Sequence, residues 1–418
     1  MAIIIADGYC ITSTGFAAPA IAREWQLTAG QLGPIFSATL LGMLLGAPLF
    51  GYLGDRYGRR KAILVATAVF TAFTMLSALA TNPWQLIVIR IIDGFGIGGI
   101  TSNIIALLSE AMPKRKRTHS IMAALAGTSI GGALPGVIAI VAPDHYIWQS
   151  IYLLGGGIGV ILLVLAWIYL PESPIYLGAR GHIGRAKKSL ELILGQPVVT
   201  GDDSLDCRTM EQGKRPSPLA LFRNRLVLVT PLLWLANVCN FLVIFFLISW
   251  TPILLQELDV SEDQASVVNA VFALAGVVGA FLAMRYVDRY GFKALCAMFL
   301  IGGMSTALMG TVGIFSLGAL LAVAFVAGAS IVSTQYSLGA MSALIYPSTI
   351  KSLGAGWALA VGRAGSVIGP LVGAALVGAK LDVSYLYFAA ATPLFAAAII
   401  SIMLARLVLN LPTMSGES

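Results

Sequence analysis

GFGIGGITSNIIALLSEAMPKRKR (residues 94–117) has a counterpart later in the chain, GASIVSTQYSLGAMSALIYPSTIK (residues 328–351). Gly94 aligns with Gly328, and the proline near the end of each segment aligns at the same separation along the chain. Each segment is a long, largely apolar run that ends at a proline. The pattern indicates that one structural unit occurs twice.

A second pair of segments supports the duplication. GDRYGRRKA at residues 54–62 returns as VDRYGFKA at residues 287–294, with Asp55 aligned to Asp288. The separation of these aspartates differs by only one position from that of Gly94 and Gly328. Two separate landmarks with nearly equal separations predict two related halves. Repeated helical halves are one architecture of membrane proteins.

The composition is that of a membrane protein. The chain of 418 residues is 58% hydrophobic and 11% charged, whereas soluble domains have roughly 25% charged residues. Its mean hydropathy is +0.88. Apolar runs long enough to cross a bilayer as helices recur throughout, and they lack the alternation of a β-barrel. We therefore predict an all-α membrane protein with twelve transmembrane helices in two six-helix pseudo-repeats, at 2–23, 32–53, 61–80, 84–108, 120–142, 147–170, 226–251, 264–286, 292–312, 316–345, 351–378 and 384–408.

One long polar segment separates the first six predicted spans from the last six. Residues 1–170 are expected to form the first six-helix bundle and residues 226–418 the second, with a cytoplasmic central loop at 171–225. This loop contains PESPIYLGARGHIGRAKKSLELILG, which predicts an amphipathic helix lying along the membrane surface.

Basic residues cluster in alternate loops, as expected when those loops are cytoplasmic. The orientation predicts that both chain termini are cytoplasmic, and it accounts for the net charge of +7 without a nucleic-acid partner. The basic clusters are Arg56, Arg59, Arg60 and Lys61; Lys114, Arg115, Lys116 and Arg117; the segment 171–225; and Arg289 and Lys293.

The sequence holds no signal for a metal or an organic cofactor. The four cysteines have no metal-binding spacing. Gly94, Gly96 and Gly99 satisfy G-x-G-x-x-G, but they lie inside a predicted span with no strand before them, so helix packing explains them. No ATP-binding motif occurs. We expect no enzyme activity.

Several motifs resemble those of a known family. The segments GYLGDRYGRRK and RIIDGFGIG are similar to signatures of the major facilitator superfamily. Further segments resemble the aromatic acid:proton symporter family: DGYC…GFAAPAI, EAMPKRKR, PESP, LWLANVCNFLVIFFLISWTPILL and YPSTIKSLGAGWALAVGRAGSVIGP. The resemblance implies a transporter of the bacterial inner membrane, functional as a monomer, that takes up a hydroxybenzoate-like aromatic carboxylic acid with protons by alternating access.

Ionisable residues within spans are expensive in lipid and are therefore candidates for function. All three histidines lie in predicted loops, so a carried proton requires a carboxylate. Asp7 is the expected proton carrier, with Arg90 as its counter-charge and Glu110 as a further coupling or gating residue that could pair with Arg117. The simpler alternatives are that Asp7 is a wetted helix-end residue and that Asp93 only pairs with Arg90.

The second half contains the candidates for substrate binding. Arg363 lies well inside a glycine-rich span, and guanidinium can bind a carboxylate through two hydrogen bonds. Aromatic and amide side chains could hold a planar ring. For the aromatic and amide residues the alternative explanation is ordinary packing, and for Arg363 it is a structural pair with a neighbouring acid or with backbone carbonyls. The set is Arg363, Gln335, Tyr336, Trp234, Asn237 and Asn240.

The duplicated D-R-Y-G segment predicts a gate. Asp55 lies at the unfavourable C-terminal pole of its helix and should find a partner, either a loop arginine or a helix N-terminus. Gly51 and Gly58 are expected to permit close approach and a tight turn. A topology-setting basic loop is the alternative for the arginines. The predicted gating residues are Gly51, Asp55, Arg56, Gly58, Arg59, Arg60, Asp288 and Arg289.

One residue departs from the family pattern, which has a second aspartate where this chain has Cys10. The departure concentrates the proton role on Asp7 and suggests a less hydrophilic aromatic substrate. A symporter for another organic acid, a drug or metabolite efflux antiporter, a non-transporting sensor and a channel remain alternatives. We also expect native residues before Met1.

Overall fold

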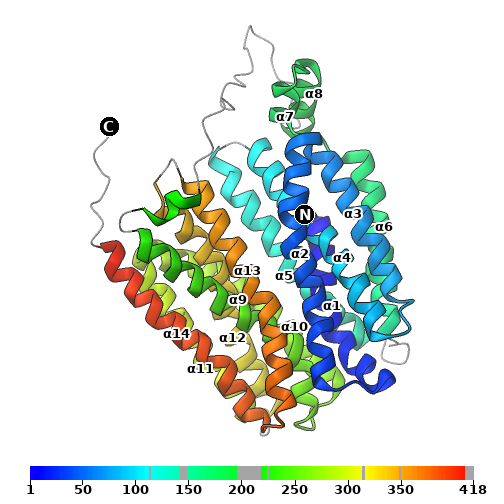
Figure 1. The fold of residues 1–418 in the computed structure, drawn as a ribbon, viewed down its shortest axis with the longest axis vertical. Coiled ribbons are helices and arrows are strands. Elements are labelled where there is room, and N and C mark those ends of the chain that lie inside the picture. Colours follow the sequence, from blue (N-terminus) through cyan, green and yellow to red (C-terminus); the bar gives the residue numbers. More distant parts are fainter. Residues whose placement is uncertain are drawn as a thin grey trace. The chain divides into compact units, whose positions relative to one another are not determined.

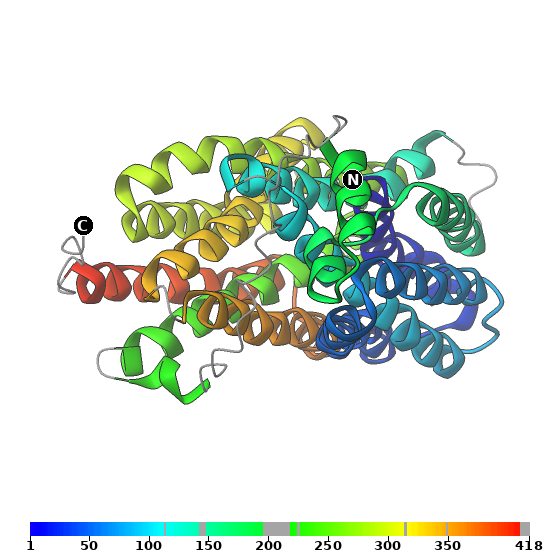
Figure 2. The ribbon, with the colours of Figure 1, turned by 90° about the horizontal axis from the view of Figure 1, so that it is seen from above.

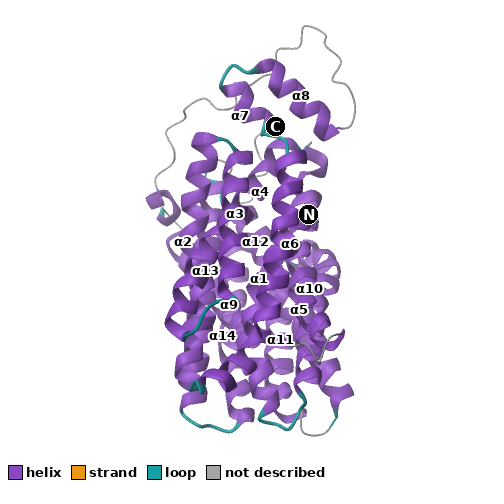
Figure 3. Cartoon of the chain, turned by 90° about the vertical axis from the view of Figure 1, so that its right-hand side faces the viewer, coloured by secondary structure: helices purple, strands orange, loops and turns teal. Residues whose placement is uncertain are grey.

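The computed structural model describes residues 1–112, 114–141, 148–194, 218–223, 226–312, 316–347 and 350–409. These residues form helices and no strand (Figure 3). Twelve of the described helices are long: α1 (Ala2–Trp25), α2 (Ala29–Tyr57), α3 (Arg59–Ser77), α4 (Pro83–Ala111), α5 (Lys114–Val141), α6 (Trp148–Tyr169), α9 (Leu226–Gln256), α10 (Glu262–Tyr290), α11 (Phe292–Val312), α12 (Leu317–Ile345), α13 (Lys351–Gly378) and α14 (Val383–Leu409).

The long helices follow the order of the predicted spans, and the prediction of an all-α membrane protein is confirmed. Ten of the described helices are long and apolar enough to cross a membrane, namely α2, α3, α4, α6 and α9 to α14. The other two long helices are α1, which contains Asp7, and α5. Helix α5 begins at Lys114 rather than at residue 120, because lysine and arginine are good helix formers and extend the helix into the basic run.

Local sequence explains where several helices begin. The Asn82 side chain accepts a hydrogen bond from the Gln85 amide, and Pro83 occupies the first turn of α4, where a missing N–H costs nothing. Ser261 caps α10 in the same way through the Gln264 amide. These capping residues satisfy backbone groups that the first turn of a helix leaves without a partner.

The polar central segment contains short helices. They are α7 (Pro174–Ala179), α8 (Ile183–Leu194) and the 3₁₀-helix η3 (Pro218–Phe222). Helix α8 is the predicted amphipathic helix, with Ala186 and Ser189 buried and most of its other side chains more exposed. Helices α7 and α8 lie beyond the ends of α3 and α6 (Figure 1).

The chain forms two compact units. The first contains residues 1–13, 38–131 and 147–215, and the second contains residues 14–37, 132–146 and 216–418. Helices α1, α2 and α5 therefore contribute to both units. Most of the second unit consists of α9 to α14, coloured green to red in Figure 2. The bundle boundaries at residues 170 and 226 stay a prediction.

The helix bounds reproduce the predicted repeat. Helices α2 and α10 have 29 residues each. The first and the last residue of α10 follow those of α2 by the interval that separates Asp55 from Asp288. Helices α4 and α12 also have 29 residues each. The first and the last residue of α12 follow those of α4 by the interval that separates Gly94 from Gly328. These two helix pairs therefore correspond between the halves, as the sequence predicts.

Close helix crossings repeat as well. A Cβ added at Gly46 of α2 would lie 2.3 Å from the Phe95 carbonyl oxygen of α4. At the equivalent Gly279 of α10, it would lie 2.0 Å from the Ala329 carbonyl oxygen of α12. Small residues let transmembrane helices approach this closely.

The first and fifth helices of each half cross in the same manner. An added Cβ at Gly131 of α5 would lie 1.8 Å from the Ile5 carbonyl oxygen of α1. At Gly365 of α13, it would lie 2.2 Å from the Val238 carbonyl oxygen of α9. The interval from Ile5 to Val238 equals the interval from Asp55 to Asp288, so α9 corresponds to α1 in the same repeat.

The glycines of the discounted G-x-G-x-x-G pattern pack against neighbouring helices, as predicted. An added Cβ at Gly94 would lie 2.1 Å from the Thr39 carbonyl oxygen, and at Gly96 it would lie 2.6 Å from the Ala66 carbonyl oxygen. Both contacts are with backbone, so these glycines serve helix packing.

Candidate functional site

Within the first unit, Asp7 is buried and bonded to the fourth helix. Its side chain is 1% exposed, and its Oδ2 accepts a hydrogen bond of 2.9 Å from the Thr101 hydroxyl of α4. The alternative of a helix-end residue wetted by solvent is therefore wrong, because the carboxylate is enclosed. Its predicted proton role stays a prediction.

Arg90 lies at the centre of a second buried group in the same unit. Its Nη1 lies 2.7 Å from Asp93 Oδ2, and both side chains are 0% exposed. Its Nη2 donates to the Cys10 carbonyl oxygen of α1 at 2.8 Å. The ion pair recorded for Arg90 is thus with Asp93 on its own helix, as a spacing of three residues allows.

Threonine and tyrosine side chains complete this group. The Thr74 hydroxyl of α3 donates to Asp93 Oδ1 at 2.8 Å and lies 3.7 Å from Cys10 Sγ. The guanidinium carbon of Arg90 lies 5.2 Å from the ring centre of Tyr152, a cation–π distance. We call Cys10, Thr74, Arg90 and Asp93 the buried charge cluster.

In the second unit, the structure brings three of the predicted amide residues together. Asn240 Nδ2 donates to Gln335 Oε1 at 2.9 Å, and Gln335 Nε2 donates to Asn237 Oδ1 at 3.4 Å. Asn237 and Asn240 belong to α9, and Gln335 belongs to α12. We call these residues the amide cluster.

Aromatic residues lie next to the amide cluster along α9. Trp234, one helical turn before Asn237, stacks on Trp357 of α13 at a centroid distance of 6.0 Å and meets Phe222 edge-on at 5.5 Å. Trp234 therefore already has two aromatic neighbours in this structure.

Arg363 lies at the level of the amide cluster. Its neighbour in α13 is Gly362, where an added Cβ would lie 2.8 Å from Asn237 Cβ and 3.1 Å from the Phe241 ring. Arg363 is half-buried, as is Tyr336 of α12. The predicted substrate-binding residues of the second unit thus come from three adjacent helices, α9, α12 and α13.

The repeat relates the Asp7 contact to the amide cluster. Asn240 is the equivalent of Asp7 at the interval that relates Asp55 to Asp288, and Gln335 is the equivalent of Thr101 at the interval that relates Gly94 to Gly328. The Thr101–Asp7 and Asn240–Gln335 hydrogen bonds, both 2.9 Å long, are therefore equivalent contacts in the two halves. One half carries an ionisable carboxylic acid at this place and the other carries amides.

A third polar group joins the ends of α2, α3 and α4 in the first unit. Arg59 Nη2 lies 2.5 Å from Asp55 Oδ1 and 3.0 Å from Glu110 Oε1. Ser173 Oγ donates to Glu110 Oε2 at 2.5 Å. The prediction that Asp55 pairs with a loop arginine is confirmed. Within the described residues, Glu110 forms its ion pair with Arg59, and the side chain of Arg117 lies outside them.

The other predicted gating residues of the first unit make backbone contacts around the same helix ends. The Arg60 amide donates to Glu172 Oε1 at 3.0 Å, and Arg60 Nη2 donates to the Trp167 carbonyl at 2.5 Å. The Arg56 carbonyl accepts from Arg180 Nη2 at 2.6 Å. Glu172 belongs to PESP, a segment that the sequence singled out without assigning the residue a contact.

The two gating glycines differ. Gly58 has φ +105° between the end of α2 and the start of α3, so the tight turn predicted there is confirmed. At Gly51 an added Cβ would meet nothing within 4 Å. Among the described residues, nothing therefore packs closely on the Cβ side of Gly51, although its carbonyl oxygen accepts a hydrogen bond of 3.5 Å from Arg59 Nη1. The close approach of a neighbouring helix predicted at Gly51 is not found in this structure.

The equivalent helix ends in the second unit are less connected. Asp288 and Arg289 are exposed, and the guanidinium carbon of Arg289 lies 5.3 Å from the adjacent Tyr290 ring. Among the residues that the structure describes, neither has a recorded ion pair, unlike Asp55 of the first unit. Their gating role stays a prediction.

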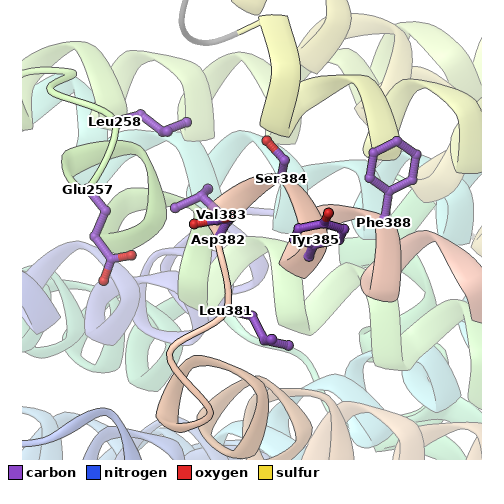
Figure 4. Close-up of a pocket in the computed structure, with 8 residues that line it drawn as sticks. All are labelled: Glu257, Leu258, Leu381, Asp382, Val383, Ser384, Tyr385 and Phe388. Atoms are coloured by element: carbon purple, nitrogen blue, oxygen red, sulfur yellow. The ribbon is translucent and has the colours of Figure 1, made fainter.

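A pocket of about 670 Å³ opens at other helix ends of the second unit. It is lined by Glu257, Leu258, Leu381, Asp382, Val383, Ser384, Tyr385 and Phe388 (Figure 4). Burial raises the pKa of the Glu257 carboxyl, because a charged group loses solvation there. None of the predicted substrate-binding residues lines this pocket.

Comparison with known proteins shows which families the chain matches. A family model described as Major Facilitator Superfamily matches residues 1–256 and, a second time, residues 233–415. The gallate transporter of Pseudomonas putida is 31% identical over 398 residues, which cover 95% of this chain and 88% of that protein. The 4-hydroxybenzoate transporter PcaK of Acinetobacter baylyi is 32% identical over 403 residues, with the same coverage of 95% and 88%.

A solved structure shows the same fold. The xylose transporter XylE from E. coli matches with a TM-score of 0.72, covering 100% of this chain and 98% of that one. The sequence identity is 17%, so this likeness concerns the fold alone.

Proposed function

The chain belongs to the major facilitator superfamily, and from this premise we propose that it takes up an aromatic carboxylic acid together with protons by alternating access. It is a multi-pass membrane transporter and not an enzyme. The observation that carries the proposal is the equivalence of the Asp7–Thr101 and Asn240–Gln335 contacts, one with an ionisable carboxylic acid and one with amides that can bind a polar ring substituent.

Asp7 is the proposed proton carrier. Its enclosure and its contact with Thr101 of α4 support this role, because a carboxylate that is enclosed in one state and wetted in another can bind a proton on one side of the membrane and release it on the other. Arg90 and Glu110 are proposed to act with Asp7, the first at the same crossing of α1 and α4 and the second at the end of α4. The proton is the only coupling species that the proposal requires.

The second unit is proposed to bind the acid. Arg363 would hold the carboxylate, because a guanidinium can donate two parallel hydrogen bonds to it. Asn237, Asn240 and Gln335 would bind a hydroxyl on the ring, and Trp234 and Tyr336 would contact its faces. The names of the gallate and 4-hydroxybenzoate transporters support a hydroxylated benzoate as the substrate.

The proposed setting is a bacterial inner membrane, with both termini and the central segment on the cytoplasmic side and with the monomer as the functional form. The alternation of basic loops supports this orientation. The ion pairs of Arg59 with Asp55 and Glu110 would then stabilise one state of the transporter and bias its alternation.

Transport of labelled 4-hydroxybenzoate into proteoliposomes tests the proposal. We expect accumulation that requires an inward proton gradient and disappears with a protonophore. Benzoates should compete, whereas aliphatic acids should not. Accumulation that persists without a gradient would contradict proton coupling, and equal competition by aliphatic acids would point to a symporter for another organic acid.

The variant Arg363→Lys should raise the KM for 4-hydroxybenzoate by about tenfold with little change in maximal rate. Lysine keeps the charge but loses the planar pair of donors, so binding weakens in the ground and transition states alike. Initial rates over a range of substrate concentrations measure the effect. Arg406→Lys, at an exposed position in the last turn of α14, is the matched control and should leave KM unchanged. An unchanged KM for Arg363→Lys would remove Arg363 from the binding site.

A further inference from the structure

The buried charge cluster is present in one half of the repeat and absent from the other. Residues of α1 and α3 are related to their equivalents in the second half by the interval from Asp55 to Asp288. Residues of α4 are related to theirs by the interval from Gly94 to Gly328. The residues equivalent to Cys10, Thr74, Arg90 and Asp93 are then Val243, Ala307, Ala324 and Ala327. All four equivalents are small or aliphatic and buried in the second half. The second half therefore packs with apolar side chains at these four positions.

A buried ion pair needs a reason other than stability. Desolvation of both charges offsets much of their attraction, and replacing such a pair by apolar residues is often neutral or stabilising. The second half has apolar residues at the positions equivalent to this ion pair. Keeping Arg90 and Asp93 in the first half therefore indicates a role in what that half does.

The contacts show what the pair positions. Asp93 binds Nη1 of Arg90, which leaves Nη2 to donate to the Cys10 carbonyl. Cys10 lies three residues after Asp7 on α1. Helix α1 is thus bonded to α4 at two levels, through Arg90 and Cys10 and through Thr101 and Asp7.

We propose that Asp93 is a positioning residue for proton coupling: its carboxylate orients Arg90, and Arg90 holds the segment of α1 that carries Asp7. This inference rests on the proposed function of Asp7. The inference adds that the buried charge cluster needs one carboxylate. An aspartate at position 10 can supply that carboxylate as well, because Cys10 Sγ and the Asp93 carboxylate lie against the same Thr74 hydroxyl.

Moving the carboxylate from position 93 to position 10 tests the proposal in the full chain. Asp93→Asn removes the carboxylate that pairs with the buried guanidinium, and Cys10→Asp places a further carboxylate beside it. Each single variant should lower the melting temperature, because each unbalances the buried charge. The double variant Cys10→Asp/Asp93→Asn restores one carboxylate and should melt above either single variant. Cys10→Asn/Asp93→Asn, which lacks the charge, is the matched control and should not recover.

Transport separates positioning from a merely structural role. In proteoliposomes with equal amounts of folded protein, Asp93→Asn should lose gradient-driven accumulation of labelled 4-hydroxybenzoate by about tenfold or more. Exchange of the same acid without a gradient should stay within about threefold of wild type. The Cys10→Asp/Asp93→Asn variant should recover accumulation, and its uncharged control should not.

Each outcome decides one claim. If accumulation and exchange fall together in Asp93→Asn, Asp93 is needed for the transport cycle as a whole and does not specifically position the proton-coupling residues. If the double variant melts no higher than the singles, or if the uncharged control recovers as well, position 10 does not host the carboxylate. If the wild-type chain accumulates no acid, the proposed function fails, while the melting temperatures still test the shared carboxylate.

Discussion

The variant Asp7→Asn is expected to abolish proton-driven accumulation of 4-hydroxybenzoate while the protein remains folded in the membrane. Asparagine matches the shape of aspartate and still accepts a hydrogen bond from Thr101, but it cannot bind and release a proton. Removing the group that exchanges a proton typically costs about a hundredfold or more in rate. Accumulation should therefore fall to the level of empty liposomes.

The repeat gives an independent reason to expect a folded variant. Asn240 is the equivalent of Asp7, and there an amide is buried and bonded to Gln335. An amide is thus compatible with this helix crossing. Tryptophan-detected melting and gel filtration should show a folded monodisperse protein.

The matched control for Asp7→Asn is Asp259→Asn. Asp259 lies in the turn after α9 and has φ +60°, a backbone conformation that asparagine adopts readily. The chemical change is the same, at a site outside the helices, and transport should be unaffected. Full accumulation by Asp7→Asn, or an equal loss in Asp259→Asn, would contradict the assignment of the proton to Asp7.

The fold was predictable because it depends on features that repeat along the sequence. The aligned landmarks around Asp55 and Asp288 gave the correct correspondence of helices, and apolar runs gave their order. Helix ends were less predictable. The start of α5 was missed because basic residues both mark a loop and extend a helix, and hydropathy alone does not distinguish the two.

Polar residues within spans were recognised, but their partners were predicted only in part. Asn240 and Gln335 were both expected to serve the substrate, and the structure joins them by a hydrogen bond. Arg90 was predicted to be the counter-charge of Asp7, with a pair between Arg90 and Asp93 as the simpler alternative, and the structure shows the ion pair with Asp93. The choice between two carboxylates depends on how α1 and α4 are rotated, which spacing along one helix does not determine.

The departure at Cys10 shows the same limit. The sequence revealed a missing carboxylate in α1, but not that Asp93 of α4 lies against the same Thr74 hydroxyl as Cys10. This shared contact requires α3 to lie beside both Cys10 and Asp93, and no residue pattern in α3 predicts that arrangement.

The crossing glycines lead to the second prediction of large effect, that Gly328→Ala prevents α10 and α12 from packing. An added Cβ at Gly328 would lie 2.1 Å from the Phe272 carbonyl oxygen, and this neighbour is backbone that no rotamer change can move. Overpacking of this kind costs about 1–3 kcal/mol or more. We expect a lower melting temperature and a strongly reduced yield of monodisperse protein.

Because the halves repeat, Gly94→Ala should have the same effect in the first unit, where an added Cβ would lie 2.1 Å from the Thr39 carbonyl oxygen. Gly339→Ala is the control on the same helix as Gly328, since an added Cβ there meets no atom of the described residues within 4 Å. Alanine is favoured over glycine in a helix by about 1 kcal/mol, so the control should melt at or above wild type. Opposite signs for Gly328 and Gly339 would show that the crossing, and not helix propensity, requires glycine; equal melting temperatures for both would mean that α10 and α12 do not cross this closely in the membrane.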